Sequence, residues 1–134
     1  MNFYNGFSPA QRVKALNWSK AERAEGKRKL KADKCMACGQ THGLIQFHSE
    51  DYSEPFGPHI GAYEFCYRCH IVLHCRHRNP IGWERYKMLL RFGFSWVPMS
   101  TPNFQRIQST LNGTEKPVSQ GEPRDNLIFD EMKI

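Results

Sequence analysis

The sequence predicts a small α+β domain in which two short strands lie between helices. Three observations support this fold class. Two runs rich in aromatic and β-branched residues are bounded by turn-forming residues, as strands are. Flanking stretches instead repeat apolar residues at helical spacing. Two Cys-x-x-Cys pairs, one before the first strand run and one after the second, indicate that a single centre ties the strands to the helix that follows.

Length and charge suggest three segments. The 134 residues suffice for one modest core, and no apolar run approaches the roughly 18 residues of a membrane span. The net charge of +6 arises between Arg12 and Lys34, where nine Lys and Arg accompany three acidic residues. We therefore expect a basic helical arm (1–34), a core domain with helices at its end (35–111), and a linker with an apolar tail (112–134).

The arm is expected to begin with a helix. Ser8-Pro9-Ala10-Gln11 puts a hydroxyl at the N-cap, proline at the first helical position and glutamine three residues after the cap. Val13, Leu16 and Trp18 would give the helix a narrow apolar stripe. Gly26 and the basic run after it should end the helix.

The basic residues of the arm are the expected contact for nucleic acid, although a solvated helix face would have the same composition. The candidate nucleic-acid contacts are Lys27, Arg28, Lys29, Lys31 and Lys34.

The strands are expected at 43–48 and 62–65, separated by a turn-rich segment with two prolines. A helix should run from the second Cys-x-x-Cys pair to Asn79-Pro80. Another should span 80–91, with Trp83, Tyr86 and Leu90 on its buried face and Gly93 as its cap. A short strand at 94–97 and a helix from Thr101-Pro102 to Leu111 would follow. The apolar tail 127–134 should dock on its own domain or on a partner protein.

All five cysteines and all six histidines lie between Cys35 and His77. Each Cys-x-x-Cys pair directs two thiolates to one centre, and four thiolates suit a tetrahedral zinc ion. Disulfides are disfavoured because Met1 to Gly6 lack the features of a secretory signal, so we expect an intracellular, reducing location. Cys75 should pack as a small apolar residue. The predicted ligands of a structural zinc are Cys35, Cys38, Cys66 and Cys69.

A second metal site is expected beside the first. His70 and His74 are one helical turn apart and share a face, while His48 ends the first strand. Together they would line a pocket for a divalent cation. In the alternative interpretation, His48 is an ordinary hydrogen-bonded histidine and His74 merely flanks the zinc.

The order of these motifs resembles the HNH endonucleases of the ββα-metal type, in the four-cysteine form of small phage and bacterial members. The resemblance covers about 45 of the 134 residues and rests on the motifs at 35–39, 48–55 and 66–74. It implies a treble-clef-like core and a metal-dependent phosphodiesterase. It also implies that His48 and His70 hold magnesium, manganese, nickel or zinc, with His74 as a further ligand.

The position that carries the base histidine in the family holds Ser49, and a serine hydroxyl stays protonated near neutral pH. His59 is the expected substitute. In a turn one residue longer, His48 would be the base and Phe47 would occupy a ligand position. The family's middle asparagine has no clear counterpart before Cys66. The candidate catalytic residues are His48, His59, His70 and His74.

Three functions are compatible with the sequence. The first is an endonuclease acting on double-stranded DNA. The second is a nucleic-acid-binding zinc protein of the same fold that has lost its base. The third is a phage-type factor that uses the basic arm and apolar tail on a host enzyme, in the cytoplasm of a bacterial host.

Overall fold

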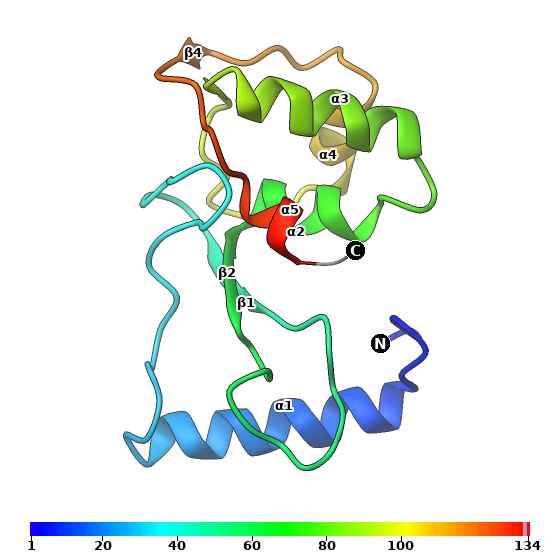
Figure 1. The fold of residues 1–134 in the computed structure, drawn as a ribbon, viewed down its shortest axis with the longest axis vertical. Coiled ribbons are helices and arrows are strands. Elements are labelled where there is room, and N and C mark those ends of the chain that lie inside the picture. Colours follow the sequence, from blue (N-terminus) through cyan, green and yellow to red (C-terminus); the bar gives the residue numbers. More distant parts are fainter. Residues whose placement is uncertain (133) are drawn as a thin grey trace.

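The computed structural model describes residues 1–132 and 134 (Figure 1). The chain combines helices with two small antiparallel sheets, which is consistent with the α+β class. The elements are α1 (Pro9–Ala24), β1 (Ile45–His48), β2 (Tyr63–Cys66), α2 (Tyr67–His74), α3 (Pro80–Arg91), β3 (Phe94–Ser95), α4 (Phe104–Leu111), β4 (Ser119–Gln120) and α5 (Ile128–Glu131).

The β1–β2 hairpin lies between α1 on one side and the remaining helices on the other (Figure 1). The strands are antiparallel, and Ile45 is paired with Cys66 while His48 is paired with Tyr63. Because side chains alternate along a strand, His48 faces α2 and its neighbour Phe47 points to the opposite face, toward α1. The hairpin therefore has two different faces.

The start and end of α1 are as predicted. Ser8 accepts a hydrogen bond from the backbone of Gln11, and the Gln11 side chain accepts one from the backbone of Ser8. The helix ends at Ala24, and Gly26 follows with a positive φ of 77°. A residue with this φ ends a helix, and glycine adopts it without the clash that a Cβ would cause.

The predicted apolar stripe of α1 is wrong. Val13 and Leu16 are 42% and 37% exposed, whereas Ala15 and Ser19 are buried. The helix packs through small side chains because the loop between β1 and β2 lies directly against it. Ala15 belongs to a small hydrophobic cluster with Tyr52 and Ile60 from this loop. Trp18 is half-buried at the edge of the same cluster.

The main core lies on the other side of the hairpin. Trp83, Tyr86 and Leu90 are buried on one face of α3, as predicted. Val72 and Leu73 from α2 pack into the same core. α4 adds three buried residues to this side of the molecule, namely Ile107, Thr110 and Leu111.

The C-terminal segment packs against the main core. Leu127, Phe129 and Met132 are buried in it, so the tail docks on its own domain. The segment expected as a linker is also held in place, because β4 pairs with β3 and Arg124 donates to the carbonyl oxygens of Leu90 and Cys38. Within the described residues, no helix is long and apolar enough to cross a membrane.

Candidate metal centres

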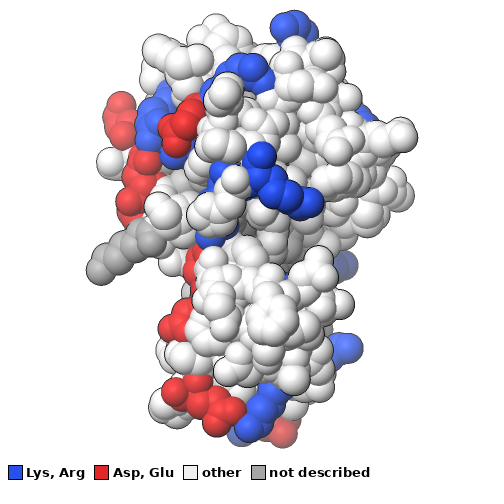
Figure 2. Space-filling view, turned by 90° about the vertical axis from the view of Figure 1, so that its right-hand side faces the viewer, with Lys and Arg blue, Asp and Glu red and all other residues white. Residues whose placement is uncertain are grey.

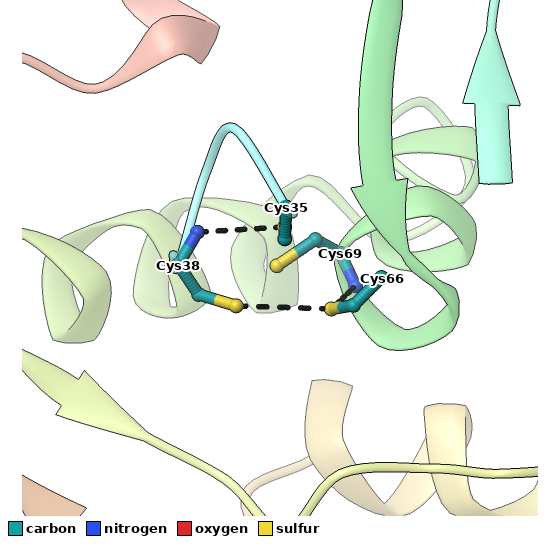
Figure 3. Close-up of side chains that lie close together, drawn as sticks. All are labelled: Cys35, Cys38, Cys66 and Cys69. Carbon is teal, nitrogen blue, oxygen red and sulfur yellow. Dashed lines mark hydrogen bonds between the residues drawn. The ribbon is translucent and has the colours of Figure 1, made fainter. Parts of the chain in front are cut away.

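The cysteines of the two Cys-x-x-Cys pairs form one compact cluster (Figure 3). Cys35 and Cys38 come from the loop ahead of β1, and Cys66 and Cys69 from the junction of β2 and α2. The four Sγ atoms lie within 4.8 Å of one another, and those of Cys38 and Cys66 are 3.8 Å apart. Two sulfurs bound to one tetrahedral zinc at the usual distance are also about 3.8 Å apart. The cluster is therefore close enough to bind a metal ion such as zinc.

Backbone and side-chain hydrogen bonds hold the sulfurs in place. The N–H groups of Cys38 and Cys69 donate to the sulfurs of Cys35 and Cys66, at 3.5 and 3.4 Å. The hydroxyl of Tyr86 lies 3.0 Å from the sulfur of Cys69. Burial, with the neighbouring thiols, raises the pKa of Cys69 well above its ordinary value. Metal binding through the Cys69 sulfur would therefore release the proton of this thiol.

Cys75 lies outside the cysteine cluster. It is the C-cap of α2, is only 3% exposed and packs in the main core. Its predicted role as a small apolar residue is confirmed.

Three histidines form a second cluster on the α2 face of the hairpin. His48 ends β1, and His70 and His74 lie one turn apart on α2. One ring nitrogen of each lies within 4.8 Å of the others, and the Nε2 atoms of His70 and His74 are 3.1 Å apart. Two imidazole nitrogens on one tetrahedral ion are about 3.3 Å apart. The three side chains thus converge as the sequence predicts.

Gln46 fixes the tautomer of His70, and burial favours the neutral form of His70 and His74. His70 donates from Nδ1 to the side-chain oxygen of Gln46 at 2.8 Å, which leaves its Nε2 lone pair toward His74. Burial, followed by the charge of nearby His48, lowers the pKa of His70 to about 2 and that of His74 to about 3. Neutral imidazole is the form that binds metals.

A polar group that the sequence analysis missed covers the histidine cluster. The ring of Tyr4 lies 4.5 Å from that of His74, and its hydroxyl lies 3.4 Å from Nε2 of His48. Tyr4 donates to a Glu50 oxygen at 2.7 Å, and Arg76 donates to the Tyr4 hydroxyl at 2.8 Å. The N-terminal residues are thereby anchored over the cluster.

Glu50 is the acidic member of this group. Burial raises its pKa, but hydrogen bonds from His48 and Tyr4 and the charge of Arg76 outweigh burial and lower the pKa to about 2. Glu50 and Arg76 each lie two residues from a predicted ligand, which is a local signal that the sequence analysis could have used. Tyr4 gives no such signal, because 44 residues separate it from His48.

Ser49 and His59 lie in the loop after β1. Ser49 is buried, and its hydroxyl oxygen accepts a hydrogen bond from the backbone of Gly61 at 2.5 Å. His59 donates from Nε2 to the carbonyl oxygen of Ser53 at 2.8 Å. His59 is not part of the three-histidine cluster.

Many basic residues of the arm are already paired. Lys27 contacts Glu25 at 2.8 Å, and Lys29 contacts Glu64 at 2.9 Å. Arg28 is half-buried and points inward. The predicted contacts that are exposed and form no ion pair with any described residue are Lys31 and Lys34.

Lys and Arg form several separate groups on the face drawn in Figure 2, with Asp and Glu beside some of them. This face therefore presents no continuous basic surface. Contacts to a polyanion would depend on particular residues and not on the total charge.

Fold and site together define a small α+β protein with a four-cysteine cluster able to bind a metal such as zinc, beside a cluster of three histidines. No protein-family model, curated protein or solved structure matches the chain.

Proposed function

We propose that this protein is an HNH-like, metal-dependent DNA endonuclease. The observation that carries the proposal is the convergence of His48 from β1 with His70 and His74 from α2, in a strand–strand–helix order that resembles the ββα type. The cysteine cluster supports it, because zinc there would fix the junction of β2 and α2 that carries two of the histidines.

The residues around the histidines would prepare the site for phosphate chemistry. A divalent cation on the three imidazoles would stabilise negative charge on the scissile phosphate and the leaving oxygen. Gln46 would orient His70, as outer hydrogen-bond partners of metal ligands do. Among the four cations considered, imidazole nitrogen favours nickel and zinc, and magnesium prefers oxygen ligands.

The base that activates water has two candidates. His59 is the substitute that the sequence suggests, but its ring is bonded to Ser53 and lies outside the cluster. Glu50 contacts His48 at 3.0 Å and is ionised, although its low pKa makes it a weak proton acceptor. Both are proposals for test.

A supercoiled-plasmid nicking assay with magnesium, manganese, nickel or zinc tests the proposal. We expect His48→Ala and His70→Ala to abolish nicking and to leave zinc in the cysteine cluster. The matched control is His77→Ala, which removes an exposed histidine outside the cluster. If His59 is the base, His59→Ala should slow turnover about a hundredfold, and otherwise Glu50→Gln should.

A nucleic-acid-binding protein without catalysis is the second proposal. Ser49 favours it, because a serine hydroxyl stays protonated near neutral pH and cannot replace a histidine base, and this one is buried and accepts a hydrogen bond from the backbone of Gly61. Tight DNA binding without nicking in any of the four metals would support this function over the first. Ser49→His should then restore cleavage if only the base is missing.

A further inference from the structure

A pocket of about 490 Å³ lies on the face of the hairpin opposite the histidines. The C-terminal half of α1 and the residues after it form one wall, with Trp18, Arg23 and Arg28. Phe47 of β1 and Gly61 of the following loop form the other. None of the predicted metal ligands lines this pocket.

Two guanidinium groups meet in the pocket. Arg23 and Arg28 both donate to the hydroxyl oxygen of Ser19, which is only 1% exposed. Arg28 also donates to the carbonyl oxygen of Ile60. The guanidinium carbon of Arg23 lies 3.8 Å from the centre of the Phe47 ring. The two cations are therefore held close together by neutral partners.

Two carboxylates, those of Glu22 and Glu64, line the same pocket. Glu64 contacts Lys29 at 2.9 Å, and Glu22 contacts Lys27 at 3.8 Å. Among the described residues, neither Arg23 nor Arg28 forms a salt bridge. Burial, and then the charge of Arg28, lowers the pKa of Arg23 from its ordinary value, and the charge of Glu64 opposes this shift only in part. An anion bound between the two groups would relieve this repulsion.

We propose that this pocket binds a phosphate group between Arg23 and Arg28. The planar fork of a guanidinium matches two phosphate oxygens, and a pair of such forks suits a group that carries more than one negative charge. The phosphate belongs either to a nucleic-acid backbone or to a free phosphomonoester. Phosphate binding in this pocket requires no metal. Only the assignment of the phosphate to a nucleic-acid backbone rests on the proposed function.

Nuclear magnetic resonance of the arginine side chains tests the site in the full-length, zinc-loaded protein. Inorganic phosphate is titrated at constant ionic strength, and the Nε resonances of Arg23 and Arg28 should shift in a saturable way. Acetate is titrated in parallel. No saturable shift with phosphate, or an equal affinity for acetate, overturns the proposal.

Two double variants distinguish phosphate binding in the pocket from a general effect of positive charge. Arg23→Gln combined with Arg28→Gln should weaken phosphate binding at least tenfold, since both charge-assisted forks are lost. Lys20→Gln combined with Lys116→Gln removes the same charge from exposed residues outside the pocket and should leave binding unchanged. Equal loss in both pairs overturns the proposal. If the arginine pair does not fold, Arg23→Lys and Arg28→Lys keep the charge without the fork and should each weaken binding.

A short DNA duplex and a nucleoside monophosphate distinguish the sources. If the pocket binds a backbone phosphate, the arginine variant should lower the slope of log affinity for the duplex against log salt concentration by about one. The lysine variant should not lower this slope further than the arginine variant does. A free phosphomonoester predicts weaker monophosphate binding with unchanged duplex binding. If the arginine variant binds both the monophosphate and the duplex as the wild type does, the proposal is overturned. Plasmid nicking is scored separately, so a nuclease that fails the phosphate titration and a phosphate site without cleavage give different results.

Discussion

Tyr86 is the residue that contacts both the cysteine cluster and Trp96 of the main core. Its hydroxyl contacts the sulfur of Cys69 at 3.0 Å, and its ring stacks on Trp96 with centres 4.7 Å apart. A hydrogen bond to a thiolate spreads negative charge, so Tyr86 should help the cluster to hold a cation.

Tyr86→Phe should therefore lower zinc affinity without unfolding the protein. Loss of such an outer partner usually costs 10–100-fold in metal affinity, and we expect a decrease of about tenfold by competition with a chelator. Tyr67→Phe is the matched control, because Tyr67 is buried but its hydroxyl forms no hydrogen bond with a cluster sulfur among the described residues. Equal affinities of the two variants would exclude this role for Tyr86.

Cys66→Ser should remove zinc and unfold the hairpin–α2 junction. Serine is a poor zinc ligand, and metal binding to such a cluster is part of the folding free energy. Elemental analysis should give about one zinc per chain for the wild type and less than half for the variant. Cys75→Ala should keep its zinc, because Cys75 lies outside the cluster. A folded, zinc-free Cys66→Ser variant would contradict the structural role.

Two helices end at glycines that differ only in their surroundings. Gly26 after α1 and Gly93 after α3 have φ values of 77° and 89°. A methyl group on Gly26 would meet no atom within 4 Å, whereas one on Gly93 would overlap the carbonyl oxygens of Gly121 and Glu122. The end of α3 is thus in contact with the segment that carries β4.

Gly26→Ala should cost about 1 kcal/mol of unfolding free energy, because the left-handed conformation is strained for alanine. Gly93→Ala should cost clearly more, since the backbone of residues 121–122 must also move. Chemical denaturation of the two variants measures the difference. Equal losses would mean that the segment does not pack closely on α3.

Elements with local signals could be predicted from the sequence, and faces that depend on distant partners could not. The capping box and Gly26 define α1, and Trp83 with Tyr86 identifies the buried face of α3. The buried face of α1 was missed because the loop that packs on it, about 40 residues away, favours small Ala15 over Leu16.

The tail contributes to the stability of the whole molecule. Phe129 is 3% exposed, and its ring lies 4.9 Å from Trp83 and 5.4 Å from Phe65. The tail thereby joins α3 to the hairpin strand that leads into the cysteine cluster. Composition alone predicts a linker at 112–126, because the segment is held by β4, Glu115 and Arg124, and their partners lie elsewhere in the sequence.

Phe129→Ala should destabilise the folded protein by about 3–5 kcal/mol, the usual cost of removing a buried phenylalanine ring. Phe104→Ala removes the same group from a side chain that is 45% exposed, and it should cost much less. Thermal unfolding of the zinc-loaded proteins makes the comparison. A similar melting temperature for both variants would show that the tail is not part of the core.

The candidate site could be predicted where sequence spacing determines geometry. Cys-x-x-Cys pairs and a His70/His74 pair meet through local backbone geometry, and His48 joins them through a short hairpin. Tyr4 could not be predicted, because it reaches the site through the path of the whole N-terminal arm. The Arg23–Arg28 pair likewise depends on how α1 packs on the hairpin.

The number of metal ions per chain shows whether the histidine cluster is a second metal site. Zinc-loaded protein is titrated with nickel by calorimetry, and we expect one further ion per chain for the wild type and for His77→Ala. His70→Ala should bind no further ion and should retain the zinc of the cysteine cluster. If the wild type binds no second ion, or if His70→Ala binds nickel as the wild type does, the three histidines are not a metal site.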